Sequence, residues 1–262
     1  MNSQTRQRVK ARISEKMNDI LNRRLRELKS DRENLVMANP FGSRLVPQEI
    51  WKGSKFERSF VTSFGQGVYE QIAYEIAVGS GAQAENQHSE TVVLTTWQDE
   101  AINNLLTEQR GNREPDAPNW ENERESITRL SNPAKVEAEI RFDLYIKRQD
   151  NTEEYYSLKT VKPNLDQTEI AKRDMLRVSA AKPSAMAFLA LPYNPYGESN
   201  QYRWSIPNKL FNMNESSAVL IGAEFWNSVG NSPTVYDELL EIFDEVGEEY
   251  KKRITEEYLH AE

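Results

Sequence analysis

The chain has 262 residues, of which 38% are hydrophobic and 28% charged, a composition typical of a soluble globular protein with a substantial core. Because it contains no cysteine, it forms neither disulfides nor cysteine-ligated metal sites, and no apolar run approaches the roughly 20 residues needed to cross a bilayer. The basic, polar N-terminus also has no apolar segment of a secretory signal, so we expect a cytoplasmic protein without a membrane partner.

Charge is distributed unevenly along the chain, whose net charge is −8. Residues 1–30 contain nine Lys/Arg and three Asp/Glu, whereas residues 237–262 contain three Lys/Arg and ten Asp/Glu. This imbalance excludes a uniformly basic surface for nucleic acid. Any contact with phosphates would have to use local basic patches.

Helices dominate the predicted first third of the chain. Apolar residues spaced three and four apart over residues 9–28 predict an amphipathic helix. Pro40 and Pro47 interrupt the pattern, so residues 38–56 are expected to form a connecting loop. A second helix is predicted over residues 63–77, before two glycines.

Strands and helices alternate in the predicted second half. An acidic segment with two prolines, residues 98–125, indicates a helix followed by a surface excursion. Two strands then meet at a charged turn, and a buried strand follows the next helix. The expected elements are strands 137–147 and 153–161, a helix 167–179, a strand 184–191 and a long C-terminal amphipathic helix 235–259.

These elements predict a single mixed α/β domain, since no internal repeat or low-complexity tract divides the chain. We expect an N-terminal helix and connecting loop over residues 1–55. A core over residues 56–210 and a C-terminal helical region over residues 211–262 would complete the domain.

The sequence lacks residues that several common catalytic and cofactor-binding motifs require. A dinucleotide-binding loop beginning at Gly65 and Gly67 would need glycine where Glu70 stands, and no phosphate-binding GxxxxGK[ST] loop occurs. We therefore expect no nucleotide cofactor. The two histidines, His88 and His260, offer little for a Ser-His-Asp triad or a zinc site.

The two central strands bring an acid and a lysine together. Asp143 lies among alternating apolar residues 142–146, and Ser157 and Lys159 share one face because strand side chains repeat every two residues. A carboxylate can hold Mg²⁺ while a neighbouring lysine positions water and stabilises developing negative charge, which favours metal-assisted hydrolysis. The alternative is a simple surface salt bridge between neighbouring strands.

Four stretches of the chain resemble a known group of enzymes. The chain is similar, over most of residues 56–245, to type II restriction endonucleases of the TdeIII and MjaII kind, which belong to the PD-(D/E)XK nuclease superfamily. The stretches are FERSFVTSFGQGVYEQIA (residues 56–73), FDLYI (142–146), SLKTVKPN (157–164) and GAEFWNSVG (222–230).

The resemblance implies a restriction-endonuclease-like α/β fold with a mixed central β-sheet flanked by helices. It also implies Mg²⁺-dependent hydrolysis of double-stranded DNA at a short palindromic site of the GGNCC type. Because such sites are symmetric, we expect a homodimer. The alternatives are a repair or recombination nuclease of the same fold that cuts by DNA structure, and a catalytically inactive DNA-binding module.

Carried over residue by residue, the superfamily motif falls on the two strands. Asp143 matches the acid of the "PD" position, although Phe142 replaces the proline, and Lys159 matches the terminal lysine. Ser157 is a departure, because the pattern expects Asp or Glu there and a hydroxyl brings no charge to a metal. A second carboxylate should therefore come from a helix.

Two glutamates are candidates for that second carboxylate. Glu70 lies on the helix before the core sheet, where the superfamily often places an acid, and is the preferred candidate. Glu169 opens the helix after Lys159, which is the position used in branches with SxK. Asp166 and Glu169 also have the spacing of a helix capping box, which would give Glu169 a purely structural role.

Sequence recognition is assigned to the helix that follows Lys159. Arginine can bind guanine through two hydrogen bonds and aspartate can accept from cytosine, although the same residues are also compatible with a solvated helix face. The polar, aromatic loop 191–204 is a second candidate. The expected DNA contacts are Lys162, Lys172, Arg173, Asp174, Arg177 and Arg203.

Overall fold

The computed structural model describes residues 1–31, 40–111 and 118–260, which form two compact units. A helical unit contains Met1–Glu75 and Asp237–Glu262, and a sheet unit contains Ile76–Tyr236. These boundaries differ from the three expected segments, and the single domain stays a prediction. Within the described ranges no helix combines the length and apolarity that crossing a bilayer requires.

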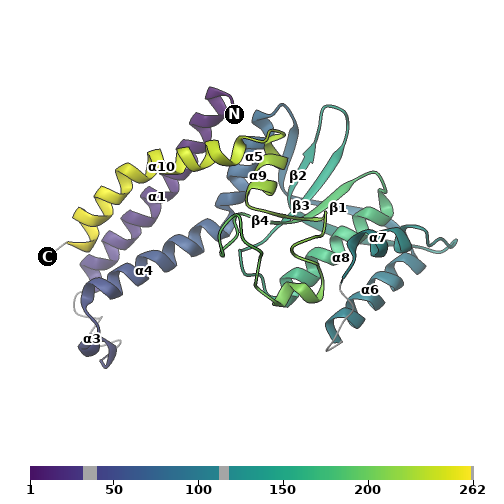
Figure 1. Ribbon diagram of the computed structural model, residues 1–262, viewed down its shortest axis with the longest axis horizontal. Coiled ribbons are helices and arrows are strands. Elements are labelled where there is room, and N and C mark those ends of the chain that lie inside the picture. The colour runs from purple at the N-terminus through teal and green to yellow at the C-terminus, as the bar shows by residue number, and fades with distance from the viewer. Residues whose placement is uncertain (32–39, 112–117, 261–262) are drawn as a thin grey trace. The chain divides into compact units, whose positions relative to one another are not determined.

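The helical unit is built on two long helices of opposite charge (Figure 1). The basic α1 (Ser3–Asp31) and the acidic α10 (Val235–Arg253) are joined by Glu245, which accepts hydrogen bonds from Arg6 at 2.5 Å and Lys10 at 2.8 Å. These ion pairs hold the pKa of Glu245 down to about 2, against a smaller effect of burial. The charge imbalance of the sequence is thus partly satisfied within this unit.

Helical structure between α1 and the sheet unit begins earlier in the chain than expected. Besides the short α3 (Gly42–Leu45), α4 (Gln48–Ser63) occupies much of the segment predicted as a loop. That prediction is wrong because Pro47 directly precedes the first turn of α4, where proline is tolerated. Residues 38–39 lie outside the described residues. A π-helical segment (Phe64–Val68) joins α4 to α5 (Tyr69–Gly79), and another (Ile254–Leu259) follows α10.

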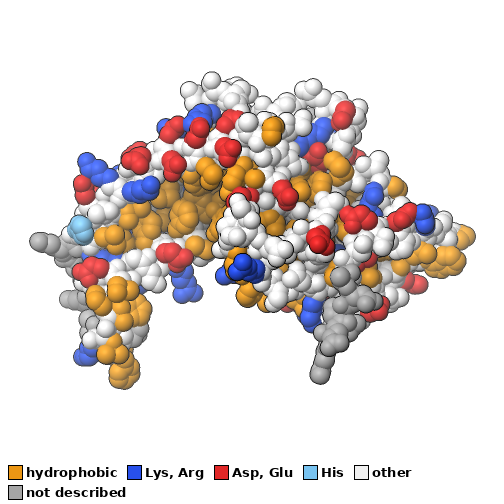
Figure 2. Space-filling model, in the orientation of Figure 1, with side chains coloured by type: hydrophobic (Ala, Val, Ile, Leu, Met, Phe, Trp, Pro, Cys, Tyr) orange, Lys and Arg blue, Asp and Glu red, His pale blue; other side chains and the backbone are white. Residues whose placement is uncertain are grey.

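An apolar groove opens on the helical unit, where hydrophobic side chains gather between α10 and α4 (Figure 2). Its volume is about 260 Å³. The lining includes Met17, Phe60, Phe243 and Val246. Outside the groove, Phe41 and Leu45 of α3 are each 82% exposed. The same unit therefore presents both an apolar hollow and an apolar projection.

The sheet unit contains a five-stranded mixed sheet in the order β1-β2-β3-β4-β5. The first three strands are antiparallel, and β3, β4 and β5 are parallel. This arrangement, flanked by helices, confirms the predicted fold class. The strands are β1 (Gln83–Thr95), β2 (Lys135–Lys147), β3 (Glu153–Leu158), β4 (Met186–Leu191) and β5 (Val219–Ile221).

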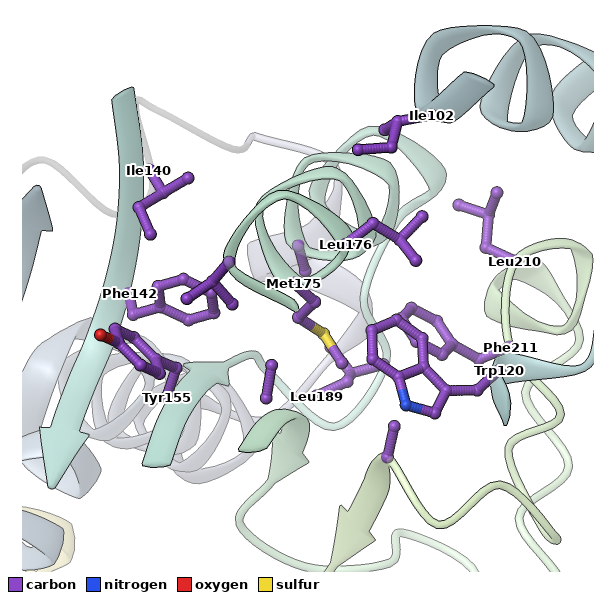
Figure 3. Packing of buried hydrophobic residues seen from close by; sticks show 14 of the residues in the cluster. Ile102, Trp120, Ile140, Phe142, Tyr155, Met175, Leu176, Leu189, Leu210 and Phe211 are labelled. Carbon is purple, nitrogen blue, oxygen red and sulfur yellow. The ribbon is translucent and has the colours of Figure 1, made fainter. Parts of the chain in front are cut away.

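Helix α8 (Leu165–Ala181) connects β3 to β4 and covers one face of the sheet. Its Met175 belongs to the same buried cluster as Phe142 and Tyr155 of the sheet, and its side chain runs toward Leu189 of β4 (Figure 3). Two further helices, α6 (Thr96–Gly111) and α7 (Trp120–Thr128), pack on α8. On the other face, the ring of Tyr156 lies 5.9 Å from Phe225 of α9 (Ala223–Gly230).

The alternation of side chains along β2 changes phase at Asp143. In a regular strand, residues three apart point to opposite faces. Here both Phe142 and Tyr145 lie against Tyr155, with ring centroids 5.1 and 5.0 Å away. Opposite this point, Gln87 of β1 has a φ of 54°, and the pairing between the strands skips Gln87 and Asp143. The sheet is therefore distorted where Asp143 leaves it, as at β-bulges beside active sites.

Candidate active site

The predicted acid and lysine meet at one end of the sheet. The ammonium Nζ of Lys159 donates to Asp143 Oδ2 at 2.8 Å, and the two side chains are 19% and 20% exposed. Lys159 follows the last residue of β3, and its backbone N–H donates to Ala190 of β4 at 2.9 Å. The lysine is thus fixed by the sheet, with its charged end beside Asp143 and accessible to a ligand.

The serine before this lysine is buried at the same end of the sheet. Ser157 is 3% exposed and pairs with Leu189 of β4. A hydroxyl at this position contributes no negative charge. A second carboxylate for this site must come from outside the hairpin.

Asp174 of α8 lies next to strand β2 of the hairpin. Its Oδ2 accepts a hydrogen bond from the backbone N–H of Arg141 at 3.3 Å, and Lys159 is among the cations that act on it. Burial raises the pKa of Asp174 to about 6, although this hydrogen bond and the nearby cations oppose the rise. The carboxylate therefore faces the strand that carries Asp143.

This position corrects the prediction that Asp174 contacts a DNA base. Asp174 is only 8% exposed and lies on the side of α8 that packs on the sheet. The sequence did contain a signal for this placement, since Asp174 is spaced three and four residues from the buried Ala171 and Val178. An acid on the apolar stripe of a helix is costly unless it is paired, and it often serves a function.

The predicted DNA contact Lys172 is also wrong, because its side chain is fully buried. The ammonium contacts Gln109 at 2.9 Å, the backbone oxygen of Leu210 and the carboxylate of Glu123. Burial lowers the pKa of Lys172, while Glu123 opposes this change. Lys172 therefore links α8 to α6 and α7 from the inside of the unit.

The exposed side of α8 forms ion pairs with α6. Glu169 accepts hydrogen bonds from Arg173 and Arg110, each at 2.5 Å, and Arg177 binds Asp99 at 2.9 Å. Burial opposes the ionised form of Glu169, but the hydrogen bonds from Arg110 and Arg173 hold its pKa below the usual range. The two partners of Glu169 thus lie on α6 and α8, and neither of them lies on the hairpin.

The start of α8 differs from the predicted capping box of Asp166 and Glu169. The helix begins two residues earlier, with Asn164 as its N-cap, and the side chain of Asn164 accepts from Gln167 N at 2.8 Å. Gln167 completes the reciprocal pair by accepting from Asn164 N at 3.3 Å. Glu169 is thus not required for capping.

The second glutamate candidate belongs to the helical unit. Glu70 lies in the first turn of α5 and is half-buried. Its role as a metal ligand stays a prediction. Over the described residues, no cluster of three or more Asp, Glu or His side chains is arranged to hold a metal ion.

Two predicted DNA contacts lie on loops that pack against each other beyond the hairpin. Tyr202 donates to the backbone oxygen of Val161 at 2.8 Å, and Trp204 donates to that of Pro163 at 3.0 Å. Lys162 and Arg203, which neighbour these residues, are exposed, and neither has a carboxylate partner within the parts of the chain that are described. The loops form a basic, aromatic surface next to the strand end that leads to Lys159.

Comparison with known proteins shows the class to which the chain belongs. The chain is 34% identical over 226 residues to the type II restriction enzyme HgiBI of Herpetosiphon aurantiacus, covering 84% of this chain and 81% of that enzyme. HgiEI and HgiCII of the same organism are 34% and 32% identical, with the same coverage. These similarities define a site-specific deoxyribonuclease.

The particular family follows from a second comparison. The family described as "Type II restriction endonuclease, HinfI" matches residues 5–247, which include most of both units. The chain belongs to the HinfI family of type II restriction endonucleases. The predicted enzyme class is therefore confirmed, and the finer resemblance to the TdeIII and MjaII kind stays a prediction.

The buried position of Lys172 can be tested by unfolding. Lys172→Ala removes the partner of the partly buried Glu123, so it should lower the free energy of unfolding by about 3–5 kcal/mol. Lys162→Ala, which removes the same side chain from an exposed loop, should change it by less than about 0.5 kcal/mol. Urea denaturation followed by circular dichroism measures both. Equal stability of the two variants would contradict the buried placement.

Proposed function

We propose that the chain cleaves double-stranded DNA at a short palindromic site of the GGNCC type, with Asp143 and Lys159 at the reaction centre. The observation that carries this proposal is the 2.8 Å contact between these two residues at the distorted end of the sheet, in a chain of a restriction endonuclease family. A cytoplasmic location is part of the proposal, since cellular DNA or entering foreign DNA is the substrate. We also propose that the chain is related to the type II restriction endonucleases of the TdeIII and MjaII kind.

The oxygen ligands near the hairpin suit Mg²⁺. Asp143 and Asp174 offer carboxylate oxygens, which are the donors that this hard cation prefers. Burial keeps the pKa of Asp174 raised despite the nearby Lys159, so an added positive charge would stabilise its ionised form. We propose these two residues as ligands. When bound, the ion supplies a more acidic water and neutralises charge on the phosphate.

Lys159 contributes a positive charge and a proton donor. Its ammonium already points at Asp143, so it would lie within reach of a phosphate placed at that carboxylate. In this position it can orient the attacking water by hydrogen bonding and stabilise negative charge that develops on the phosphoryl oxygens. The attachment of Lys159 to β4 through its backbone keeps the ammonium in place during the reaction.

We propose that DNA sequence recognition uses the two loops near the hairpin that carry Lys162 and Arg203, rather than α8 alone. Lys162 and Arg203 are exposed and available, whereas Arg173 and Arg177 would have to leave carboxylate partners before they could contact a base. Aromatic rings around Lys162 limit its mobility, with Tyr196 and Trp204 at 5.6 and 5.8 Å. A cation held in this way loses little conformational entropy on binding a phosphate.

A homodimer formed by the helical unit is the proposed assembly. The exposed α3 residues Phe41 and Leu45 and the apolar groove lined by Phe60 and Phe243 belong to one unit. Two copies related by a two-fold axis can each place the α3 projection in the other's groove, so that both apolar surfaces leave water together. The groove lining is almost free of charge, which favours an apolar occupant.

The catalytic assignment predicts separate losses of cleavage and binding. With Mg²⁺ and plasmid DNA, the wild type should give discrete fragments. Asp143→Asn and Lys159→Ala should each slow cleavage about 10²–10⁴-fold, because a metal ligand or a proton donor is lost. In Ca²⁺ both should still bind the cut site. Lys135→Ala, which removes an exposed lysine at the far end of β2, serves as the control.

Two outcomes would contradict this assignment. Cleavage by Asp143→Asn at the wild-type rate would remove the hairpin from the mechanism. Smeared products without fixed ends would instead favour a nuclease that cuts by DNA structure, and binding without any cleavage by the wild type would favour an inactive DNA-binding module.

The choice of second carboxylate predicts a difference between two matched variants of α8. Asp174→Asn keeps an oxygen that can accept from Arg141 but removes the charge, so cleavage should fall by about 10²-fold or more and require more Mg²⁺. Glu169→Gln removes the same charge from the ion pairs with α6 and should mainly lower stability. Cleavage rates over a Mg²⁺ titration measure the difference. The opposite order of losses would restore Glu169 as the ligand.

The proposed interface predicts that a single charge on α3 weakens assembly. Leu45→Asp should raise the dimer dissociation constant by about tenfold or more, because the groove cannot solvate a carboxylate. Leu240→Asp changes an exposed leucine of α10 that does not line the groove and should leave the constant unchanged. Sedimentation equilibrium measures both. A wild-type monomer that cleaves DNA at full rate would contradict the proposal.

A further inference from the structure

An arginine with no assigned role lies beside the proposed reaction centre. The guanidinium of Arg141 donates from Nη2 to Gln87 Oε1 at 2.9 Å, and Gln87 Nε2 in turn donates to Asp143 Oδ1 at 3.4 Å. Lys159 occupies the other oxygen of the same carboxylate. Asp143 therefore stands between a lysine on one side and an amide-linked arginine on the other.

The charge of Arg141 is available, unlike that of most arginines in the sheet unit. Arg148, Arg173 and Arg177 all bind carboxylates at 2.6, 2.5 and 2.9 Å. Arg141 is exposed, and across residues 1–31, 40–111 and 118–260 no carboxylate pairs with its guanidinium. A neutral amide orients the guanidinium without cancelling its charge. Such a group is suited to binding a phosphate through two parallel hydrogen bonds.

The backbone around Arg141 fixes its position from two sides. Its own N–H is bound by Asp174 of α8, and its side-chain partner Gln87 sits at a φ of 54°, which is rare for a residue with a Cβ atom. Strained conformations of this kind persist where the surroundings enforce them, and they gather at functional sites. Here the strain places one carboxamide within reach of both Arg141 and Asp143.

We propose that Arg141 and Gln87 form an anion-binding site for the phosphodiester that is being cut. Arg141 binds a non-bridging oxygen of the scissile phosphate and stabilises the extra negative charge of the transition state. Gln87 is a positioning residue that holds the guanidinium toward the phosphate and donates to Oδ1 of Asp143, the oxygen that Lys159 does not contact. The inference rests on the proposed cleavage reaction and adds no chemical step to it.

Arg141→Ala tests the role of the arginine in single-turnover cleavage of a short duplex that carries the site mapped from plasmid fragments. The rate with Mg²⁺ should fall about 10²–10³-fold, as when a single donor to a developing oxyanion is removed. Duplex binding in Ca²⁺ should weaken far less, and added guanidinium ion should restore part of the rate. Lys135→Ala, with one charge fewer on the same strand, should cleave like the wild type.

Gln87 is tested by a pair of variants of similar size. Gln87→Glu gives Arg141 a carboxylate partner and cancels its charge, whereas Gln87→Met removes the hydrogen bonds and leaves the charge free. The glutamate variant should therefore be slower than the methionine variant by about tenfold or more, with both melting near the wild type. Arg141→Lys, which keeps the charge without the planar geometry, should retain more activity than Arg141→Ala.

The outcomes separate this inference from the proposed function. If the wild type and Lys135→Ala cut the duplex and Arg141→Ala cuts it at a similar rate, the anion site is rejected while the cleavage function stands. A loss in Arg141→Ala that matches its loss of Ca²⁺-dependent binding, with no response to guanidinium, also rejects it. Absence of cleavage by the wild type would overturn the proposed function and this inference together.

Discussion

The geometry of the site depends on one unequal strand pairing. Strand β3 has six residues and β2 has thirteen, so the ladder between them involves only Leu144–Lys147 of β2. Beyond this ladder the backbone N–H of Arg141 needs another partner, because a buried donor without one is costly. Asp174 of α8 fills that need. The same hydrogen bond brings a carboxylate to the end of the β2–β3 ladder, next to Asp143.

Ion pairing within the protein decides which basic side chains remain available to bind DNA. In the helical unit, Arg6 and Lys10 of α1 pair with Glu245 of α10, and Arg8 and Arg12 pair with Glu75 of α5. In the sheet unit, the outer side of α8 is tied to α6, as with Arg177 and Asp99. Among the exposed cations without a carboxylate partner in the described residues are Arg141, Lys162 and Arg203, which lie on the hairpin and its neighbouring loops. A protein with an overall negative charge can therefore present a local positive field where DNA would bind.

Much of the fold could be predicted from the sequence, but the site could be predicted only in part. The strands β2 and β3 and the contact between Asp143 and Lys159 were predictable from period-two patterning and local turn signals. Strand β1 was missed because half of it is polar and faces solvent, and β5 because three residues carry no pattern. Lys172 was misassigned because its partners come from distant segments, which a helical wheel does not include. The phase change at Asp143 depends on a neighbouring strand and has no signature in the segment itself.

The unusual backbone at Gln87 also bears on how such an enzyme responds to selection. A non-glycine residue in the left-handed region costs on the order of 1–3 kcal/mol, and that cost is borne by the rest of the sheet. Selection for heat resistance alone would favour changes that relax this bend, because relief of strain is among the simplest gains in stability. With Gln87 in its proposed role, the relaxed protein would fold better and align its substrate less well. Under that proposal, thermal stability and catalytic rate are opposed at this single residue.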